Sequence, residues 1–379
     1  MFRIFKNYES KNKHLLALFV LTVIITLMIS SVNGANVTVS GNSFTDVENS
    51  FNSGDIVNLG SNTYFSDGNR IDVDVNNVAF IGNKNNHAVF DGRGNGVTIF
   101  DVSGRNVTFK YIDFKNVKSH SSGGCIKATN TIYVDNCLFK DNEAESGSAI
   151  GLFEDGENSV IENSIFINNH GVNPGSDNYI EGGAIDTHVT NISIRNCSFE
   201  NNFALNRGGA ISLAFGTDQV IDCIFKNNSA PSAGAIYSRN STATIINCTF
   251  EDNNVTLDGG AVFSRASNLS ITNSKFISNI AGDTGGAIYH DPVDFIVSFN
   301  ISGSTFKDNN ADTGGAIYSF GSTIIDNSDF LNNCAIRSAG AIRTGEDLKL
   351  ARSTFSGNIA GNSGGTLYLD CVKNFRVNK

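Results

Sequence analysis

The chain alternates apolar and polar residues in short runs, and each run ends where the alternation shifts phase. Between Leu269 and Phe276, Leu269 and Ile271 share one parity, whereas Ser274 and Phe276 share the other. Period-two alternation predicts a strand, and a change of parity indicates that the chain turns a corner. Asn273 lies at this change, and asparagine enters the left-handed backbone region at low cost. The pattern therefore predicts two short strands joined by a corner at asparagine.

The same unit recurs along the chain at intervals of 24 to 33 residues. Each copy has a phenylalanine, an asparagine three positions after it, and a cysteine or serine two positions before it. A Gly-Gly-Ala-Ile sequence or a near copy follows most of the phenylalanines by about ten residues. The nine phenylalanines are Phe139, Phe166, Phe199, Phe225, Phe250, Phe276, Phe306, Phe330 and Phe355, and Phe114 marks an earlier, degenerate copy.

A repeat of about 25 residues cannot bury its own apolar face, so it must stack on its neighbours. We therefore predict an all-β, right-handed parallel β-helix of roughly ten regular coils, preceded by irregular ones. Equivalent residues then form columns along the axis. We expect the phenylalanines to fill the interior and the asparagines to hydrogen-bond from coil to coil.

The predicted organisation has three parts, with boundaries at residues 34 and 110. Residues 1–34 are a signal peptide, residues 35–110 are an N-terminal cap with early irregular coils, and residues 111–379 are the regular coils. Within the second part, residues 44–51 predict a short capping helix. Such a cap is expected because a bare solenoid end is an open sheet edge.

The leader has four basic residues before an apolar run from Leu15 to Ile29 and then a stretch of small residues. This length suits a signal sequence better than a membrane span, and an uncleaved signal anchor is the alternative. Either way, the rest of the chain is expected at the cell surface or outside the cell. The membrane is a partner only through the leader, if that segment is retained.

The charge of the chain excludes one class of partner. The net charge is −10, and it becomes −13 without the leader, which holds four basic residues and one acidic residue. An acidic surface argues against nucleic acid as a partner.

The paired motifs Phe-x-x-Asn and Gly-Gly-Ala-Ile resemble the repeats of chlamydial polymorphic outer-membrane proteins. They are similar, more closely, to adhesin-like proteins of methanogenic archaea, which carry pectin-lyase-like β-helices. The stretch from Val89 to Gly94 also resembles the entry of pectin-lyase-like folds. The resemblance covers roughly residues 40–379 and implies surface exposure and adhesion.

Cysteines occupy one column of the predicted solenoid. Cys197, Cys223 and Cys248 hold equivalent positions in three successive coils. Stacked side chains that point the same way suit a disulfide poorly, and serine fills this position in other coils. We expect free thiols, with disulfides as the alternative. Seven cysteines cannot all pair within one chain.

An aromatic column is the candidate ligand-binding site. Tyr237, Phe263, Tyr289 and Tyr318 each follow Ala-Ile or its equivalent in four successive coils. If the isoleucine points inward, these rings point outward and form a stripe on one sheet face. Such a stripe is suited to the apolar faces of sugars. The alternative is that the rings stack on each other and cover the sheet.

No known catalytic constellation is recognisable, so the chain is not identified as an enzyme. Asp186 and His188 share a parity on one strand, and His290 and Asp291 lie on the equivalent strand four coils later. We interpret both pairs as surface residues. No metal-ligand spacing or cofactor motif occurs; the acidic loop at residues 154–157 is interpreted as solvated.

Two longer excursions, residues 170–181 and 290–300, are secondary binding candidates because loops on a regular scaffold often carry specificity.

The sequence thus predicts a secreted or cell-surface, adhesin-like β-helix that binds polysaccharide or cell-surface glycans. A pectin-lyase-like polysaccharide lyase or hydrolase is the first alternative, and a structural surface spacer is the second.

Overall fold

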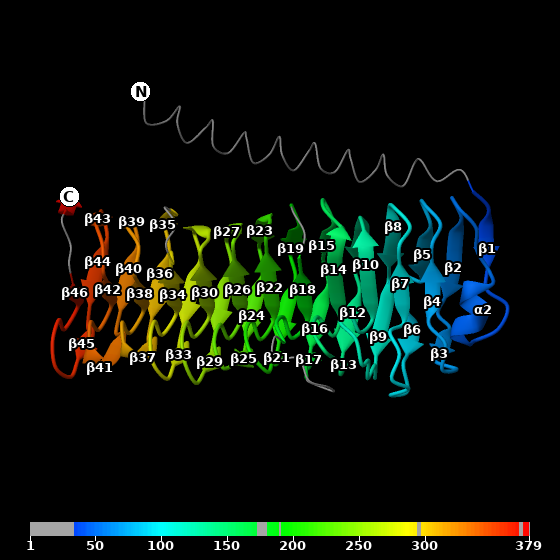
Figure 1. Ribbon diagram of the computed structural model, residues 1–379, viewed down its shortest axis with the longest axis horizontal. Coiled ribbons are helices and arrows are strands. Elements are labelled where there is room, and N and C mark those ends of the chain that lie inside the picture. The colour runs from blue at the N-terminus through cyan, green and yellow to red at the C-terminus, as the bar shows by residue number, and fades with distance from the viewer. Residues whose placement is uncertain (1–33, 173–179, 189–190, 294–296, 371–373, 379) are drawn as a thin grey trace, which may run out of the picture.

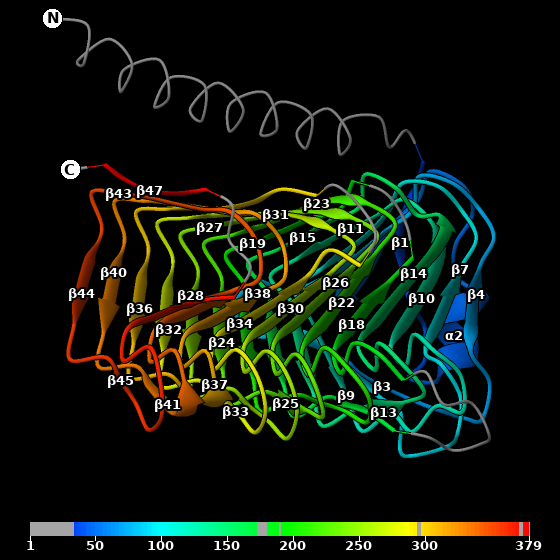
Figure 2. The same cartoon turned by 60° about the vertical axis from the view of Figure 1, so that its left-hand side comes forward.

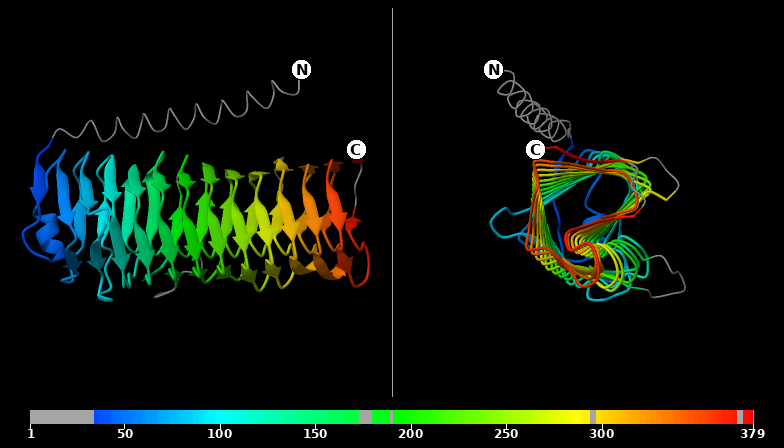
Figure 3. Two further views of the ribbon diagram at one scale, coloured as in Figure 1. Left: turned by 180° about the vertical axis from the view of Figure 1, so that it is seen from behind. Right: turned by 90° about the vertical axis from the view of Figure 1, so that its left-hand side faces the viewer.

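The computed structural model describes residues 34–172, 180–188, 191–293, 297–370 and 374–378. The strands in these ranges form four parallel sheets that extend along one solenoid (Figure 1). Seen along its axis, the coils lie over one another, and the outline is indented on one side (Figure 3). The chain is an all-β, right-handed parallel β-helix of about 12 turns, which confirms the predicted fold.

Several predicted features fall outside the described residues. They include residues 1–33 of the leader, Cys371, and parts of both excursions, residues 173–179 and 294–296. Among the described helical residues, none belongs to a segment with the length and apolarity that a membrane crossing requires.

The strands form four sheets, which we number 1 to 4 in chain order; the early coils contribute strands to sheets 1, 2 and 4, and the later coils to all four. Sheet 1 has 14 strands: β1 (Asn36–Thr38), β2 (Ile56–Gly60), β5 (Ala79–Gly82), β8 (Val107–Lys110), β11 (Ile132–Asp135), β15 (Val160–Glu162), β19 (Ser193–Arg195), β23 (Thr217–Ile221), β27 (Thr242–Ile246), β31 (Asn268–Thr272), β35 (Phe299–Ser302), β39 (Thr323–Asp326), β43 (Leu348–Ala351) and β47 (Phe375–Asn378). Sheet 2 has 12 strands: β3 (Thr63–Phe65), β6 (Ala88–Asp91), β9 (Ile112–Lys115), β12 (Leu138–Lys140), β16 (Ile165–Ile167), β20 (Ser198–Glu200), β24 (Ile224–Lys226), β28 (Thr249–Glu251), β32 (Lys275–Ile277), β36 (Thr305–Lys307), β40 (Asp329–Leu331) and β44 (Thr354–Ser356).

Sheet 3 is made of short strands and starts later in the chain than the others. Its nine strands are β13 (Glu143–Ala144), β17 (His170–Gly171), β21 (Phe203–Ala204), β25 (Ser229–Ala230), β29 (Asn254–Val255), β33 (Ile280–Ala281), β37 (Asn310–Thr313), β41 (Cys334–Ser338) and β45 (Ile359–Ala360). Sheet 4 has 12 strands: β4 (Ile71–Val73), β7 (Phe100–Val102), β10 (Ile126–Asn130), β14 (Ile150–Asp155), β18 (Ile185–Thr187), β22 (Ile211–Ala214), β26 (Ile236–Arg239), β30 (Val262–Arg265), β34 (Ile288–Asp291), β38 (Ile317–Ser319), β42 (Ile342–Thr344) and β46 (Leu367–Leu369). In Figure 2, sheet 4 lies between sheet 1 and sheet 3.

The corners between sheets use the residues that the parity changes predict. Asn273 joins β31 to β32 with a φ of 51°, and Asn247 joins β27 to β28 with a φ of 54°. The corner from sheet 2 to sheet 3 is also left-handed, as at Asp252, with a φ of 55°. Asparagine and aspartate tolerate this conformation better than most residues. Most coils therefore turn at such a residue, although Tyr111, Ser278 and Arg352 adopt the same conformation at equivalent corners.

The phenylalanine column forms one continuous stack in the interior. From Phe114 to Phe355, consecutive ring centroids lie 4.6–4.9 Å apart and the ring planes are within 8° of parallel. This spacing equals the distance between hydrogen-bonded strands. The stack confirms the predicted interior column, including Phe114 as its early member.

The asparagine column is a buried hydrogen-bond ladder, as predicted. The Nδ2 atom of Asn228 donates to Oδ1 of Asn253 over 3.1 Å, and Nδ2 of Asn253 donates to Oδ1 of Asn279 over 2.9 Å. Each amide also donates to the carbonyl of a phenylalanine, as Asn253 does to Phe225 over 3.1 Å. The same bonds repeat from Asn142 to Asn358. The ladder satisfies polar groups that the corner would otherwise bury without partners.

The column that contains serine and cysteine holds free thiols. Cys197, Cys223 and Cys248 are buried and unpaired. The Cys223 thiol lies within hydrogen-bond distance of the carbonyl of Ile194, 3.7 Å away. Where serine replaces cysteine, the hydroxyl makes a better bond: Oγ of Ser274 accepts from the backbone N–H of Cys248 over 3.1 Å. The position selects a small inward residue with a polar tip.

The structure gives the bounds of the predicted capping helix and the conformation of the Gly-Gly-Ala-Ile motif. The capping helix α2 covers Phe44–Glu48, and Ser43 caps its N-terminus through a reciprocal pair of bonds with Asp46. The Gly-Gly-Ala part of the repeat is not a strand. It forms a turn, in which the first glycine has a φ near +66°, and the strand of sheet 4 begins at the following isoleucine.

Candidate functional site

The outward column of sheet 4 carries a different side chain on most coils. Three interior columns of the solenoid instead repeat phenylalanine, asparagine, or serine and cysteine. This column changes chemistry from coil to coil. Its register-matched members are Asp72, Asp101, Lys127, Gly151, Asp186, Ser212, Tyr237, Phe263, Tyr289, Tyr318, Arg343 and Tyr368.

The four predicted binding rings belong to this column, but they do not form an exposed stripe. Tyr237, Phe263, Tyr289 and Tyr318 are in register on adjacent strands. Tyr237 is fully buried, Phe263 is 6% exposed, Tyr318 is 7% exposed, and Tyr289 is half-buried. The rings pack against one another, with centroids 5.4 Å apart for Tyr237 and Phe263 and 4.7 Å apart for Phe263 and Tyr289. The expectation of an open aromatic face is therefore wrong.

The Gly-Gly turn explains why outward-pointing rings are buried. A Cβ atom at Gly208 would lie 3.2 Å from Cβ of Tyr237, and one at Gly259 would lie 3.2 Å from Cβ of Phe263. The turn thus passes directly over the outward side of the strand. Parity alone gives the direction of a side chain but not what covers it.

A cluster of charged side chains lies on the same face, next to Tyr237. We call Glu181, Asp186, Arg207, Ser212 and Arg239 the Glu181 cluster. The Glu181 carboxylate is 3.4 Å from Nη1 of Arg207 and 3.9 Å from Nη2 of Arg239. The hydroxyl of Ser212 donates to its second oxygen over 3.4 Å. Glu181 is 3% exposed, so two arginines share one buried carboxylate.

Asp186 is the second buried carboxyl of the cluster. It is 4% exposed, and its Oδ1 atom has no hydrogen-bond partner among the described residues. Burial, and then the charge of Glu181, raise the pKa of Asp186 to about 8. Asp186 is therefore protonated at neutral pH. The interpretation of Asp186 as a surface residue is wrong, because the strand face that carries it is covered.

His188 lies at the solvent edge of this cluster. Its Nε2 atom is 3.6 Å from Oδ2 of Asp186, and its side chain is 41% exposed. Burial, and then the nearby Arg239 guanidinium, lower the pKa of His188. The imidazole is thus neutral at neutral pH and can both donate and accept a hydrogen bond.

Three rings surround the exposed edge, and we call Phe153, His188 and Phe215 the ring platform. The His188 ring lies 5.7 Å from Phe153 and 6.3 Å from Phe215, edge to face in both cases. The guanidinium of Arg239 lies 5.3 Å from the centroid of Phe215. The platform therefore joins apolar ring surface to the charged cluster below it.

Phe215 is the unusual member of the platform. It is 51% exposed, and its φ is 66°. A bulky residue in the left-handed region is uncommon and costs roughly 1–2 kcal/mol. Asn240 and Ala266 occupy the equivalent turn in the next two coils. The fold does not require an aromatic residue here.

The second predicted His-Asp pair is divided between the inside and the outside of the coil. His290 is fully buried, stacks on Phe299 at 4.8 Å, and has its Nδ1 atom 3.3 Å from Oγ of Ser264. Burial lowers its pKa to about 4. Asp291 is half-buried. The interpretation of this pair as surface residues is wrong for His290, since it faces the core.

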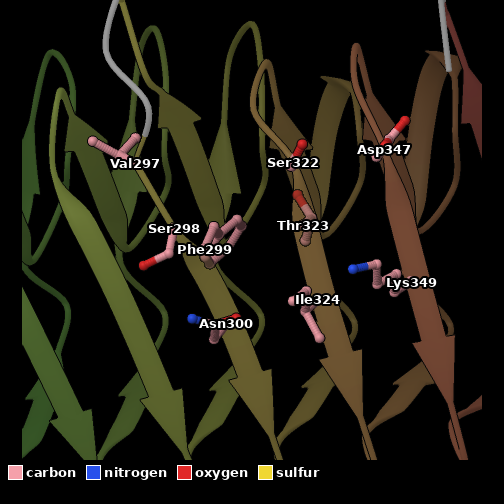
Figure 4. Close-up of a pocket in the computed structure, with 9 residues that line it drawn as sticks. All are labelled: Val297, Ser298, Phe299, Asn300, Ser322, Thr323, Ile324, Asp347 and Lys349. Carbon is pink, nitrogen blue, oxygen red and sulfur yellow. The ribbon is translucent and has the colours of Figure 1, made fainter. Parts of the chain in front are cut away.

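Two shallow cavities occur elsewhere on the described surface. One of about 210 Å³ lies at the starts of β35, β39 and β43 and includes Ser298, Asn300 and Lys349 (Figure 4). The other, of about 220 Å³, lies on the outer side of β7 and β10 and includes Arg70, Asp101, His120 and Lys127. Within the described ranges, no group of three or more His, Cys, Asp or Glu side chains is arranged to hold a metal ion.

The arrangement can bind a ligand by ring contact and by charge, and it holds a buried acid near an exposed imidazole. Sequence reasoning singled out Asp186 and His188 but interpreted them as surface residues. It included Glu181 only as the end of the excursion at residues 170–181, and it missed Arg207 and Phe215. A signal for Glu181 and Arg207 exists, because each precedes a Gly-Gly pair, as Asp258 also does, where Ser232, Thr284 and Thr313 stand in other coils. A buried position that usually holds a small hydroxyl residue and instead holds a charge marks a special site.

The comparisons with known proteins agree with the architecture. Residues 182–360 match the family model described as a right-handed beta helix region. No curated protein matches the sequence.

Two solved structures show a limited similarity to this chain. A rhamnogalacturonan lyase is 14% identical, with 79% of this chain and 82% of that chain covered and a TM-score of 0.42. PfbA, a surface adhesin of Streptococcus pneumoniae, is 16% identical, with 86% of this chain and 79% of that chain covered and a TM-score of 0.32.

Proposed function

We propose that this protein is an adhesin-like β-helix, secreted or held at the cell surface, that binds glycans on the ring platform. The observation that carries the proposal is the exposed Phe215 ring in a left-handed turn where Asn240 serves the next coil. Backbone strain at an exposed position needs a compensating role. An exposed ring beside a neutral imidazole suits a sugar, which presents apolar C–H groups next to hydroxyls.

The location of the platform supports the same function. The phenylalanine and asparagine columns keep one residue type each, whereas the outer face of sheet 4 varies. A solenoid presents a long surface whose coils can each carry a different side chain. A polymer laid along this face would meet Phe153, His188 and Phe215 on neighbouring coils. A leader that acts as a signal sequence would export this surface from the cell, which is consistent with the proposal.

The experiment is retention of the purified protein in gels containing one polysaccharide each, from a panel of plant and microbial polymers. We expect retardation by at least one polymer and its loss in Phe215→Asn. Ile224→Ser is the matched control, because Ile224 is 50% exposed on sheet 2 and should bind normally. Equal retardation of Phe215→Asn and the unaltered protein would rule out the platform as the binding surface.

A second candidate function is polysaccharide cleavage, which Asp186 favours. A buried carboxyl that is protonated at neutral pH can donate a proton to the oxygen of a glycosidic bond. Asp186 has this property, and His188 connects it to the surface. The same panel is incubated with the protein, with and without calcium, and analysed by chromatography. Released oligosaccharides that disappear with Asp186→Asn would establish cleavage; retention without release leaves binding as the function.

A further inference from the structure

We propose that the Glu181 cluster recognises an acidic group on the bound glycan, a carboxylate or a sulfate ester, and that ionisation of Asp186 releases it. This inference rests on the proposed function and names the chemistry and the regulation of the same site.

The charge balance of the cluster favours an anion. Arg207 and Arg239 both pair with Glu181, and neither has a second carboxylate within 4 Å among the described residues. Asp258 interacts with Arg207 only from farther away, so the pairs leave one positive charge in surplus while Asp186 is neutral. Both arginines remain charged at all relevant pH values. The rest of the protein carries an excess of acidic residues, so this positive spot is local. It would attract an acidic group to one place on a surface that otherwise repels it.

The unsatisfied polar atoms of the cluster are donors. The Nε atom of Arg239 and the hydroxyl of Tyr237 have no partner among the described residues, and neither does Oδ1 of Asp186. Tyr237 is fully buried and Asp186 is 4% exposed. While Asp186 is protonated, all three groups can donate a hydrogen bond. These buried groups do not reach a ligand at the solvent edge, but their unpaired N–H and O–H groups add to the positive potential of the site, which favours a negative ligand.

The acidic group would bind at the solvent edge rather than in the buried centre. The side chains of Arg207 and Arg239 are 24% and 29% exposed, and His188 is 41% exposed beside them. These edges border the ring platform through the contact of Arg239 with Phe215. A sugar ring on the platform therefore places a substituent next to the arginines. Asp186 lies behind them and acts on binding through its charge.

Asp186 is the group that changes charge in the physiological range. The polar and charged side chains that face it are Glu181 from the preceding turn, His188 from its own strand, Ser212 from β22 and Arg239 from β26. The coil on its other side contributes Gly147 and Gly151, which carry no charge. Its pKa of about 8 supports loss of the proton between pH 7 and 9. The new negative charge cancels the surplus positive charge, so binding of an anion weakens.

The test is gel retardation of the purified protein by hyaluronan, which carries carboxylates, and by dextran sulfate, with uncharged dextran as the control. Gels are run from pH 6 to 9 at constant ionic strength. We expect retardation by one of the two acidic polymers, weakening about tenfold between pH 6 and 9. Asp186→Asn should be retarded equally by the acidic polymer at pH 6 and at pH 9. Arg239→Gln should be retarded at neither pH.

Asp218→Asn is the matched control. Asp218 is also a buried carboxyl with an unpartnered oxygen, and its pKa is raised to about 7, but it points into the core. This variant should keep the pH dependence of the unaltered protein. Circular dichroism verifies that each variant is folded.

Three results would overturn the inference. Equal retardation by dextran and the acidic polymers would refute it and leave glycan binding intact. A pH dependence that survives Asp186→Asn would refute the role of Asp186. Retardation by poly-glutamate but by no polysaccharide would assign the site to an acidic peptide and refute the proposed function as well.

Discussion

Phe215 and Asn240 occupy the same turn in consecutive coils, and their φ angles are 66° and 50°. Asparagine adopts this conformation at low cost, whereas phenylalanine does not. Asn240 is therefore a residue type that suits this left-handed turn, whereas Phe215 is not.

We predict that Phe215→Asn stabilises the protein by about 1 kcal/mol, because it relieves backbone strain at an exposed position. Urea denaturation followed by circular dichroism measures the change. The same variant should lose glycan binding, so stability and binding should move in opposite directions. Phe320→Asn is the comparison. Phe320 directly follows β38 of sheet 4 and is 45% exposed, but its φ is not left-handed. This variant should therefore relieve no backbone strain. A loss of stability in Phe215→Asn would show that the ring serves the fold.

The asparagine ladder gives a second prediction. Asn253→Ala removes the acceptor of the Asn228 amide and the donor to Asn279 and Phe225. Buried groups left without partners cost about 1–3 kcal/mol each, so the variant should lose roughly 3 kcal/mol or more. The urea midpoint measures this loss.

The control for the ladder is the next residue. Asn254 is exposed, and Asn254→Ala should change stability by about 0.5 kcal/mol or less. If the two variants were equally stable, the ladder would not be a source of stability.

The pKa of Asp186 predicts a specific pH dependence of stability. The folded protein retains a proton up to about pH 8, whereas the unfolded chain releases it near the ordinary value of 3.8. Between these values the unfolded state binds fewer protons, so the stability falls as pH rises. Asp186→Asn lacks this loss of stability. Its melting temperature should be about 4 °C higher than that of the unaltered protein at pH 8, and the difference should be smaller at pH 5.

Thermal denaturation at pH 5, 6, 7, 8 and 9 measures this difference. A constant gap between Asp186→Asn and the unaltered protein at every pH would mean that Asp186 does not titrate as a buried acid. A gap that grows with pH and levels off above pH 8 is the predicted outcome.

The thiol column gives a prediction about reactivity. Burial raises the pKa of the Cys223 and Cys248 thiols, so both should resist alkylation in the folded protein and react in denaturant. Cys223→Ser should change stability by about 1 kcal/mol or less, because serine occupies this column at Ser274. Mass spectrometry of the alkylated protein without reduction reads out both states. A disulfide between Cys223 and either neighbour would contradict the free-thiol ladder.

Much of the interior was predictable because the phenylalanine and asparagine columns each repeat one residue type. The Phe-x-x-Asn motif gave the ring stack and the ladder, and the parity change at Asn273 gave the corner. Repetition makes these features visible in a single sequence, since the same residue type recurs at the equivalent position of many coils. Sheet 3 was not predicted because seven of its nine strands have only two residues, which is too short to show an alternation.

The candidate site was less predictable because it depends on contacts between coils and turns. Parity placed Tyr237 on the outer side of sheet 4, which is correct, but the turn at Gly208 covers it. Glu181 and Arg207 lie in the Gly-Gly turns of two consecutive coils, and no local sequence pattern predicts the path of these turns. The burial of Asp186, and hence its raised pKa, follows from that path.

The measurement that tests the central claim most directly is hydrogen–deuterium exchange with and without oligosaccharides of a polymer that retards the protein. We predict slower exchange in the turns after β14 and β22 and at the amides around His188 and Phe215, with no change in sheet 2. Protection confined to sheet 2, or to the cavity at Ser298 and Lys349, would contradict a glycan site on the ring platform.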